Sequence, residues 1–143
     1  MTNNNELIKF LDAQNQVYLK ALSELKKGKK DTHWMWYIFP QIKGLGSSEN
    51  ANYYGIKDLN EATAYLQHPI LGKHLIEISE VVLNLNEKTA TQIFGTPDDM
   101  KLRSCMTLFS ILDNPNPVFQ KVLDKYYEGI KDEETINSIH LSN

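Results

Sequence analysis

Apolar side chains recur every three or four residues along most of this chain, which is the spacing of one face of an α-helix. The most regular stripe runs over residues 69–85, and a second runs over 7–25 with an interruption near Asn15. The segments 97–112 and 117–126 repeat the same spacing. The pattern therefore predicts helices in all four regions. The members of the stripe over 69–85 are Ile70, Leu71, His74, Leu75, Ile78, Val81, Val82 and Leu85.

Signals for the start of a helix stand ahead of several of these stripes. One kind is a capping box, in which a side-chain acceptor is followed three residues later by Glu or Gln. The other kind is a capping residue followed directly by proline. The capping boxes are Asp58 with Glu61 and Thr89 with Gln92, and the proline starts are Thr96-Pro97 and Asn116-Pro117.

Residues 33–39 fit two interpretations, because their bulky side chains alternate as in a strand and also fit a turn of helix. The chain shows no second strand for them to pair with, so we favour the helix, with Thr32 as its cap. Residues 40–51 form the longest predicted loop and the best candidate for a mobile or ligand-contacting segment. The chain is therefore predicted to be an all-α, single-domain bundle of about six to eight helices over residues 1–143.

The composition agrees with a folded domain and bears on whether it binds nucleic acid. Of the 143 residues, 41% are hydrophobic and 23% are charged, well away from the composition of disordered chains. The formal net charge of −3 argues against a protein whose affinity for nucleic acid rests on neutralising phosphates. The one basic run, Lys26 to Lys30, is interpreted as a solvated helix end that Gly28 terminates. Contact with nucleic acid through this run is the weaker interpretation, so we do not expect a nucleic-acid partner.

Neither metal nor disulfide chemistry is indicated. The chain has one cysteine, Cys105, and four histidines without the spacing of metal ligands. Cys105 falls within the apolar arc of its helix, which is typical of a structural cysteine. Residues 1–6 do not resemble a signal peptide, and no apolar run reaches the roughly 18 residues that span a bilayer. We expect a cytoplasmic protein with no cofactor, no metal and no membrane partner.

A polar stripe on the predicted helix 97–112 is the first candidate for chemistry. Asp99, Arg103 and Thr107 lie between two apolar surfaces, which predicts a central helix whose polar stripe meets an internal partner or a cavity. One interpretation is structural, an ion pair between Asp99 and Arg103. The other is a site in which Arg103, with Thr107 beside it, binds a carboxylate or phosphate through its planar guanidinium. Lys101 adds charge to such a site or extends into solvent.

The second candidate is the aromatic segment from His33 to Gln41, which holds both tryptophans of the chain. Trp36 is typical of a core residue, whereas Trp34 and Gln41 carry polar ends near the loop and are suited to a ligand. The rings offer a stacking platform for a planar compound. His33 is the best candidate for a general acid or base, because imidazole titrates nearest neutrality.

Over roughly residues 7–136 the chain resembles the bacterial domain-of-unknown-function family 1810. The motifs that carry the likeness are His33-Trp34-Met35-Trp36, Phe39-Pro40-Gln41, Gly44-Leu45-Gly46-Ser47, Glu61-Ala62, Tyr65-Leu66, His68-Pro69, Ile93-Phe94-Gly95, Pro97-Asp98-Asp99, Lys101-Leu102-Arg103-Ser104 and Met106-Thr107-Leu108-Phe109. The resemblance implies an all-helical single-domain fold and no established activity. Such proteins are sometimes labelled calpastatin, but a compact helical domain is physically unlike that disordered protease inhibitor. Cys105 stands where the resemblance leads us to expect serine, which further weakens a thiol mechanism.

These observations predict a small-ligand site where the segment 33–41 meets the helix that carries Arg103. Its ligand would be planar and anionic, such as a nucleotide or a related metabolite, and the sequence leaves open whether the protein is an enzyme or a sensor. His33 is the predicted catalytic residue. The predicted ligand-binding residues are Trp34, Trp36, Gln41, Lys101, Arg103, Ser104 and Thr107. The alternative is a protein–protein interaction domain with an aromatic surface, in which Arg103 is structural.

Overall fold

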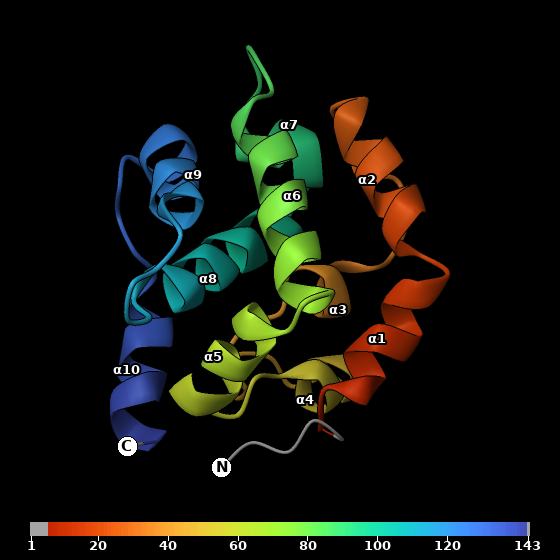
Figure 1. The fold of residues 1–143 in the computed structure, drawn as a ribbon. Coiled ribbons are helices and arrows are strands. Elements are labelled where there is room, and N and C mark those ends of the chain that lie inside the picture. The colour runs from red at the N-terminus through yellow and green to blue at the C-terminus, as the bar shows by residue number, and fades with distance from the viewer. Residues whose placement is uncertain (1–5, 143) are drawn as a thin grey trace.

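The computed structural model describes residues 6–142, and within them the chain forms ten α-helices and no β-strand (Figure 1). The all-α class is confirmed, but the predicted six to eight helices were too few. None of the helices in this range is both long and apolar enough to cross a membrane. The helices are α1 (Ile8–Asn15), α2 (Tyr18–Lys26), α3 (Met35–Ile38), α4 (Glu49–Tyr54), α5 (Leu59–Gln67), α6 (Leu71–Leu83), α7 (Ala90–Phe94), α8 (Asp98–Ser110), α9 (Pro117–Tyr127) and α10 (Glu133–Ser142).

Two features raise the helix count. The interruption predicted near Asn15 separates α1 from α2 as two helices. Helix α4 begins inside the segment 40–51, which was predicted as a loop, and extends past its end. Ser48 begins α4 by accepting a hydrogen bond from the Ala51 N–H at 3.1 Å. A helix of six residues is too short to produce a recurring apolar stripe, so periodicity did not predict it.

The centre of the fold is formed by α6 and α8. Helix α6 packs against α2, α5 and α9, and α8 packs against α5, α7, α9 and α10. Figure 1 shows α8 crossing the middle of the molecule. The six consecutive residues 104–109 of α8 are all buried, so this helix has neighbours on every side. The central position predicted from its two apolar surfaces is confirmed.

Three predicted helix starts are confirmed by their hydrogen bonds. At the start of α5, Asp58 accepts the Glu61 N–H at 2.9 Å. The Glu61 carboxylate, however, accepts the Lys57 N–H at 3.2 Å, so the reciprocal half of the predicted capping box does not form.

The other two starts form as predicted. Thr89 and Gln92 form a complete capping box at the start of α7. Asn116 accepts a hydrogen bond from the Val118 N–H at 2.9 Å, and Pro117 is the first residue of α9. Both signals act within four residues of the chain, which is why the sequence alone sufficed.

Two other predicted caps were wrong. Helix α8 begins at Asp98 after a cis Thr96–Pro97 peptide bond, and the Thr96 hydroxyl donates to the Asp99 carboxylate at 3.4 Å. Thr32 does not cap α3; its N–H and its hydroxyl donate to the Glu24 carboxylate at 3.0 and 2.6 Å. Thr32 thus gives its hydroxyl to a carboxylate, which forms a stronger hydrogen bond than a neutral partner. Thr96 cannot cap α8 because Pro97, the next residue, occupies the cap position.

The basic run after α2 is only in part a solvated helix end. Gly28 adopts a φ of +87° just beyond α2, as expected of a helix terminator. Lys30, however, is almost fully buried, with 6% of its side chain exposed. Its ammonium pairs with Asp98 at 2.9 Å, donates to the Thr32 carbonyl at 2.6 Å and lies 4.9 Å from the centre of the Trp34 ring. The prediction of four solvated lysines is therefore wrong for Lys30, because the chain turns inward after Gly28.

Candidate functional site

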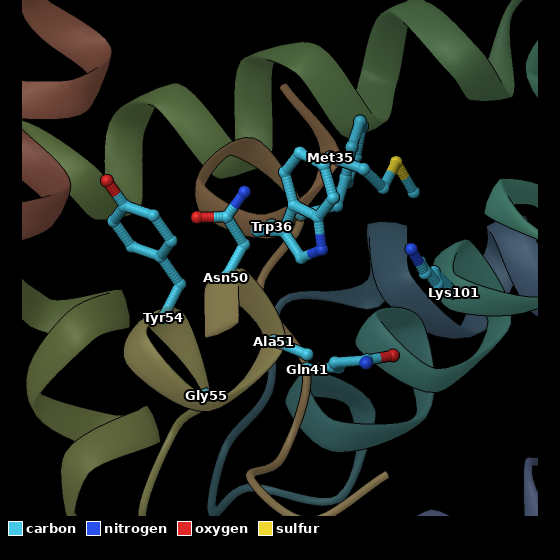
Figure 2. Close-up of a pocket in the computed structure, with 9 residues that line it drawn as sticks. Met35, Trp36, Gln41, Asn50, Ala51, Tyr54, Gly55 and Lys101 are labelled. Atoms are coloured by element: carbon cyan, nitrogen blue, oxygen red, sulfur yellow. The ribbon is translucent and has the colours of Figure 1, made fainter. Parts of the chain in front are cut away.

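Part of the predicted ligand site comes together in a small cavity between α3, α4 and the start of α8 (Figure 2). Trp36, Gln41 and Lys101 all line it, and the Lys101 ammonium lies 5.1 Å from the centre of the Trp36 ring. The cavity measures about 10 Å³, which is room for one water-sized group. Its other walls are Met35, Phe39, Asn50, Ala51, Tyr54 and Gly55.

The indole nitrogen of Trp36 is the chemically notable atom of this cavity. Trp36 Nε1 is buried and has no hydrogen-bond partner among the described residues. Figure 2 shows this nitrogen on the side of the ring that faces Lys101. A buried donor without an acceptor costs free energy, so most such donors in folded proteins have partners. The cavity therefore presents an N–H group that is suited to an acceptor from outside the chain.

The wall formed by α4 is held in place by a short backbone pairing. The Ile56 N–H donates to the Gln41 carbonyl at 2.9 Å, and the Lys43 N–H donates to the Ile56 carbonyl at 2.7 Å. Gly55 makes this approach possible, because a Cβ atom there would lie 2.7 Å from the Lys43 Cα atom. The pairing brings the end of α4 against residues 41–43 and so encloses the cavity.

Arg103 binds the connection between α9 and α10 and does not line this cavity. Its Nε donates to the Ile130 carbonyl at 2.9 Å, and its terminal nitrogen donates to the Lys131 carbonyl at 3.1 Å. The guanidinium also lies 6.0 Å from the centre of the Tyr127 ring. No ion pair joins it to Asp99 among the described residues, and the Asp99 carboxylate instead accepts the Thr91 hydroxyl.

Ser104 and Thr107, the other members of the polar stripe, hold the start of α10. The Ser104 hydroxyl donates to the Asp132 carboxylate at 3.0 Å, and the Asp132 N–H donates to the Thr107 hydroxyl at 2.9 Å. The same carboxylate accepts the Thr135 N–H at 3.1 Å, so Asp132 caps α10. The predicted ion pair between Asp99 and Arg103 is therefore wrong, but the polar stripe of α8 does have internal partners, and Arg103 holds the connection that leads into α10.

Replacing Arg103 with alanine is expected to lower the free energy of unfolding by about 2 kcal/mol, because two backbone carbonyls lose a charged donor. The amide hydrogens of α10 should exchange faster than in the wild type, since the connection that leads into α10 is no longer held. Hydrogen exchange followed by mass spectrometry tests this, with Lys121→Ala on the exposed face of α9 as the control. Unchanged protection of α10 would contradict the structural role.

His33 and Trp34 lie apart from the cavity. His33 is exposed, whereas Trp34 is fully buried and its Nε1 donates to the Glu24 carboxylate at 3.0 Å. Of the residues predicted to bind a ligand, the structure therefore unites Trp36, Gln41 and Lys101 and separates them from the rest. Asn50 and Tyr54 also line the cavity but were missed, because α4 was not predicted; Ser48, as a cap, was the available signal.

A second hollow lies at the junction of α1 and α2, where both face α6. It is an open groove of about 840 Å³, and His74 and Tyr18 are among its lining residues. His74 was placed on the apolar stripe of its helix and given no role. The available signal was a titratable side chain within an otherwise apolar stripe. No group of three or more His, Cys, Asp or Glu side chains in the part of the chain described is placed to hold a metal ion.

Comparison with known proteins gives the family of the chain. Residues 4–139 match the model of a family described as "Protein of unknown function (DUF1810)". The chain belongs to the DUF1810 family. A solved structure similar to this DUF1810 chain is that of the conserved hypothetical protein Rv1873 from Mycobacterium tuberculosis, with 45% sequence identity and a TM-score of 0.93 over 96% of this chain and 99% of that one. No curated protein matches the chain.

Proposed function

We propose that this protein binds a small planar anionic compound and that one anionic oxygen of the compound enters the cavity beside Trp36. The observation that carries the proposal is the buried Trp36 N–H, which has no partner among the described residues and lies on the same cavity as the Lys101 ammonium. A carboxylate or phosphate oxygen accepts hydrogen bonds from both kinds of donor, and such charge-assisted bonds are about twice as strong as neutral ones.

The charges around Lys101 support an anion rather than a cation. Lys101 lies 3.5 Å from one oxygen of Asp98, and Lys30 lies 2.9 Å from the other oxygen. The Lys101 ammonium therefore shares the Asp98 carboxylate with Lys30, and it can bind an oxyanion in addition.

The size of the cavity sets how much of the ligand it takes. A volume of about 10 Å³ admits one oxygen atom and not a ring. The planar part of the compound would therefore lie outside, against Trp36 and Tyr54, both of which keep some exposed surface. His33 has no part in this binding mode, and its predicted role in catalysis stays a prediction. The alternative of an aromatic interaction surface lacks a comparable observation, because Trp34 is fully buried.

Adenosine monophosphate and benzoate are expected to move the indole N–H resonance of Trp36, whereas adenosine and benzamide, which lack the anionic group, are not. The two indole signals are assigned with Trp36→Phe, and the titration is followed by NMR spectroscopy up to about 10 mM, the range of weak ligands. Lys101→Met should weaken binding of the anion at least about tenfold.

The matched control for Lys101→Met is Lys121→Met, which removes the same charge from an exposed site on α9. It should bind as the wild type does. If neither anion moves the Trp36 signal while the protein stays folded, the proposed site is wrong. Equal shifts with the anions and their neutral counterparts would show that charge has no part in binding, and would contradict the proposal as well.

A further inference from the structure

The groove between α1, α2 and α6 combines a polar floor with apolar edges. Leu19 and Ile70, at its edges, are 78% and 49% exposed and so present apolar surface beside the groove. Gln14, Tyr18 and His74 supply polar atoms to the same groove. An open concave surface that combines apolar walls with a few convergent polar groups is the usual form of a small-molecule site.

The amide of Gln14 is held in one orientation by its buried partners. Its Nε2 donates to the Tyr37 carbonyl at 2.7 Å and to the Tyr65 hydroxyl at 2.9 Å. A carbonyl oxygen can only accept, so the amide nitrogen and not the amide oxygen must face Tyr37. The Gln14 Oε1 atom is thereby turned toward His74, whose Nδ1 lies 2.8 Å away.

This orientation determines which nitrogen of His74 carries the proton. The Gln14 Oε1 atom can only accept, so His74 Nδ1 must be the protonated nitrogen of the neutral ring. The lone pair of the neutral imidazole is then on Nε2. Burial lowers the pKa of His74 and the nearby Lys73 lowers it further, while Glu77 raises it; the net shift is downward and favours the neutral form near pH 7.

The remaining ring nitrogen of His74, Nε2, has no hydrogen-bond partner among the described residues. His74 is partly exposed and is one of the residues that line the groove. Because Gln14 occupies Nδ1, Nε2 is the acceptor that this ring can offer to a ligand in the groove.

Tyr18 holds the plane of the His74 ring. The two rings stack at 3.6 Å between their centres with an angle of 8° between their planes. The Tyr18 hydroxyl donates to the Glu77 carboxylate at 2.5 Å, which anchors the phenol in turn. Burial and this contact with Glu77 raise the pKa of Tyr18, so it stays a protonated donor. His74 is thus supported on one face by Tyr18 and on one edge by Gln14.

The charges that line the groove favour a neutral ligand over an anion. Asp12 of α1 and Glu77 of α6 are negative, and Lys73 of α6 is positive, so the carboxylates outnumber the ammonium group. With Tyr18 of α2 and His74 itself, these are the titratable groups that line the groove. The Trp36 cavity instead has the Lys101 ammonium beside its indole ring, so the groove and the cavity differ in the ligands they favour.

We propose that this groove is a second binding site, which takes a small neutral compound that donates one hydroxyl or N–H hydrogen bond to His74 Nε2 while its apolar body lies on Leu19 and Ile70. The preorganised ring means that little orientational freedom is lost when the hydrogen bond forms. Neither the family match nor the similar structure assigns such a site.

Benzyl alcohol and benzyl methyl ether distinguish this proposal from simple apolar contact, because they share an apolar body and only the alcohol can donate. The alcohol is expected to shift the His74 resonances of the 15N-labelled wild type and to bind about fivefold more tightly than the ether. In the free protein, His74 Nε2 should show the resonance of an unprotonated nitrogen and Nδ1 that of a protonated one.

The variant His74→Phe keeps a ring that can stack on Tyr18 and removes the acceptor. It should bind the alcohol and the ether equally, whereas His140→Gln, which changes an exposed histidine, should keep the preference for the alcohol. Circular dichroism checks that each variant is folded. The comparison of the two compounds on the wild type tests the proposal even if a variant does not fold. A protonated Nε2 in the free protein, equal binding of the two compounds by the wild type, or no shift at His74 would each overturn the proposal.

Discussion

Replacing Glu24 with leucine is expected to lower the free energy of unfolding by about 4 kcal/mol, because a buried carboxylate that accepts four hydrogen bonds is removed while its donors stay. Glu24 is 7% exposed. Its Oε1 accepts the Asp31 N–H at 2.7 Å, the Thr32 N–H at 3.0 Å and the Trp34 indole N–H at 3.0 Å. Its Oε2 accepts the Thr32 hydroxyl at 2.6 Å. Leucine fills the space but leaves these donors unpaired.

The dependence of stability on pH tests the same cluster. Burial alone would raise the pKa of the Glu24 carboxyl, but the hydrogen bonds from Thr32, Asp31 and Trp34 outweigh it and lower the pKa from its ordinary value of 4.5 to about 2. A group whose pKa is lower in the folded state stabilises that state above its unfolded pKa. The contribution, about 3 kcal/mol, is therefore present above pH 4.5 and is lost as the pH falls toward 2.

Urea unfolding of the wild type, Glu24→Leu and Glu24→Gln between pH 2 and 7 measures both effects. Glutamine keeps an acceptor oxygen, so its destabilisation at pH 7 should be smaller than that of leucine, and its difference from the wild type should shrink as the pH falls from 4.5 to 2. Glu80→Gln, which removes an exposed carboxylate from α6, is the control and should stay close to the wild type. A Glu24→Gln protein that differs from the wild type equally at all pH values would contradict this account.

Replacing Gly72 with alanine is expected to destabilise the protein by about 3 kcal/mol, although alanine is the better helix former. Gly72 lies in the first turn of α6, where this helix crosses the end of α5. A Cβ atom at this position would lie 1.9 Å from the Leu66 carbonyl oxygen and 2.8 Å from the Leu66 carbonyl carbon. These are backbone atoms, so the overlap is relieved only by moving α5 and α6 apart. The loss of packing outweighs the roughly 1 kcal/mol of helix propensity that alanine adds.

Chemical denaturation of Gly72→Ala at pH 7 gives the size and sign of this effect. Ser23→Ala, at an exposed position of α2, serves as the control for helix propensity and should be neutral or slightly stabilising. If Gly72→Ala were as stable as the wild type, the close approach of α5 and α6 would be incorrect. The sign of the change thus distinguishes local propensity from tertiary packing.

Much of the helical architecture was predictable because its signals are local. The stripe over 69–85 gives α6, and the capping box of Thr89 gives α7, since both depend on residues within one or two helical turns. The central place of α8 also followed from the sequence, because a helix with two apolar surfaces must be covered on both. The short helix α4 was missed because its six residues are too few for a recurring pattern.

The polar partners were not predictable, because they come from distant parts of the chain. Arg103 was recognised as part of an inward-facing stripe, but its partners lie 27 and 28 residues away in the connection before α10. His74 meets Gln14 across 60 residues of sequence, and that contact depends on the packing of α1 against α3 and α6 against α2. Periodicity predicts that a side chain faces inward, but it does not predict which residue that side chain contacts.

The cavity beside Trp36, on which the proposed function rests, also combines features that the sequence predicts with features that only the tertiary structure decides. The sequence by itself determined the all-helical class, several helix starts and the aromatic and basic residues available for a site, because hydrogen bonding and periodicity within a helix are short-range. Only the tertiary structure decided that Lys101 faces Trp36 while Arg103 holds the start of α10. It decided this because two residues two positions apart on a helix point to different sides, and the neighbouring helices determine what each side contacts.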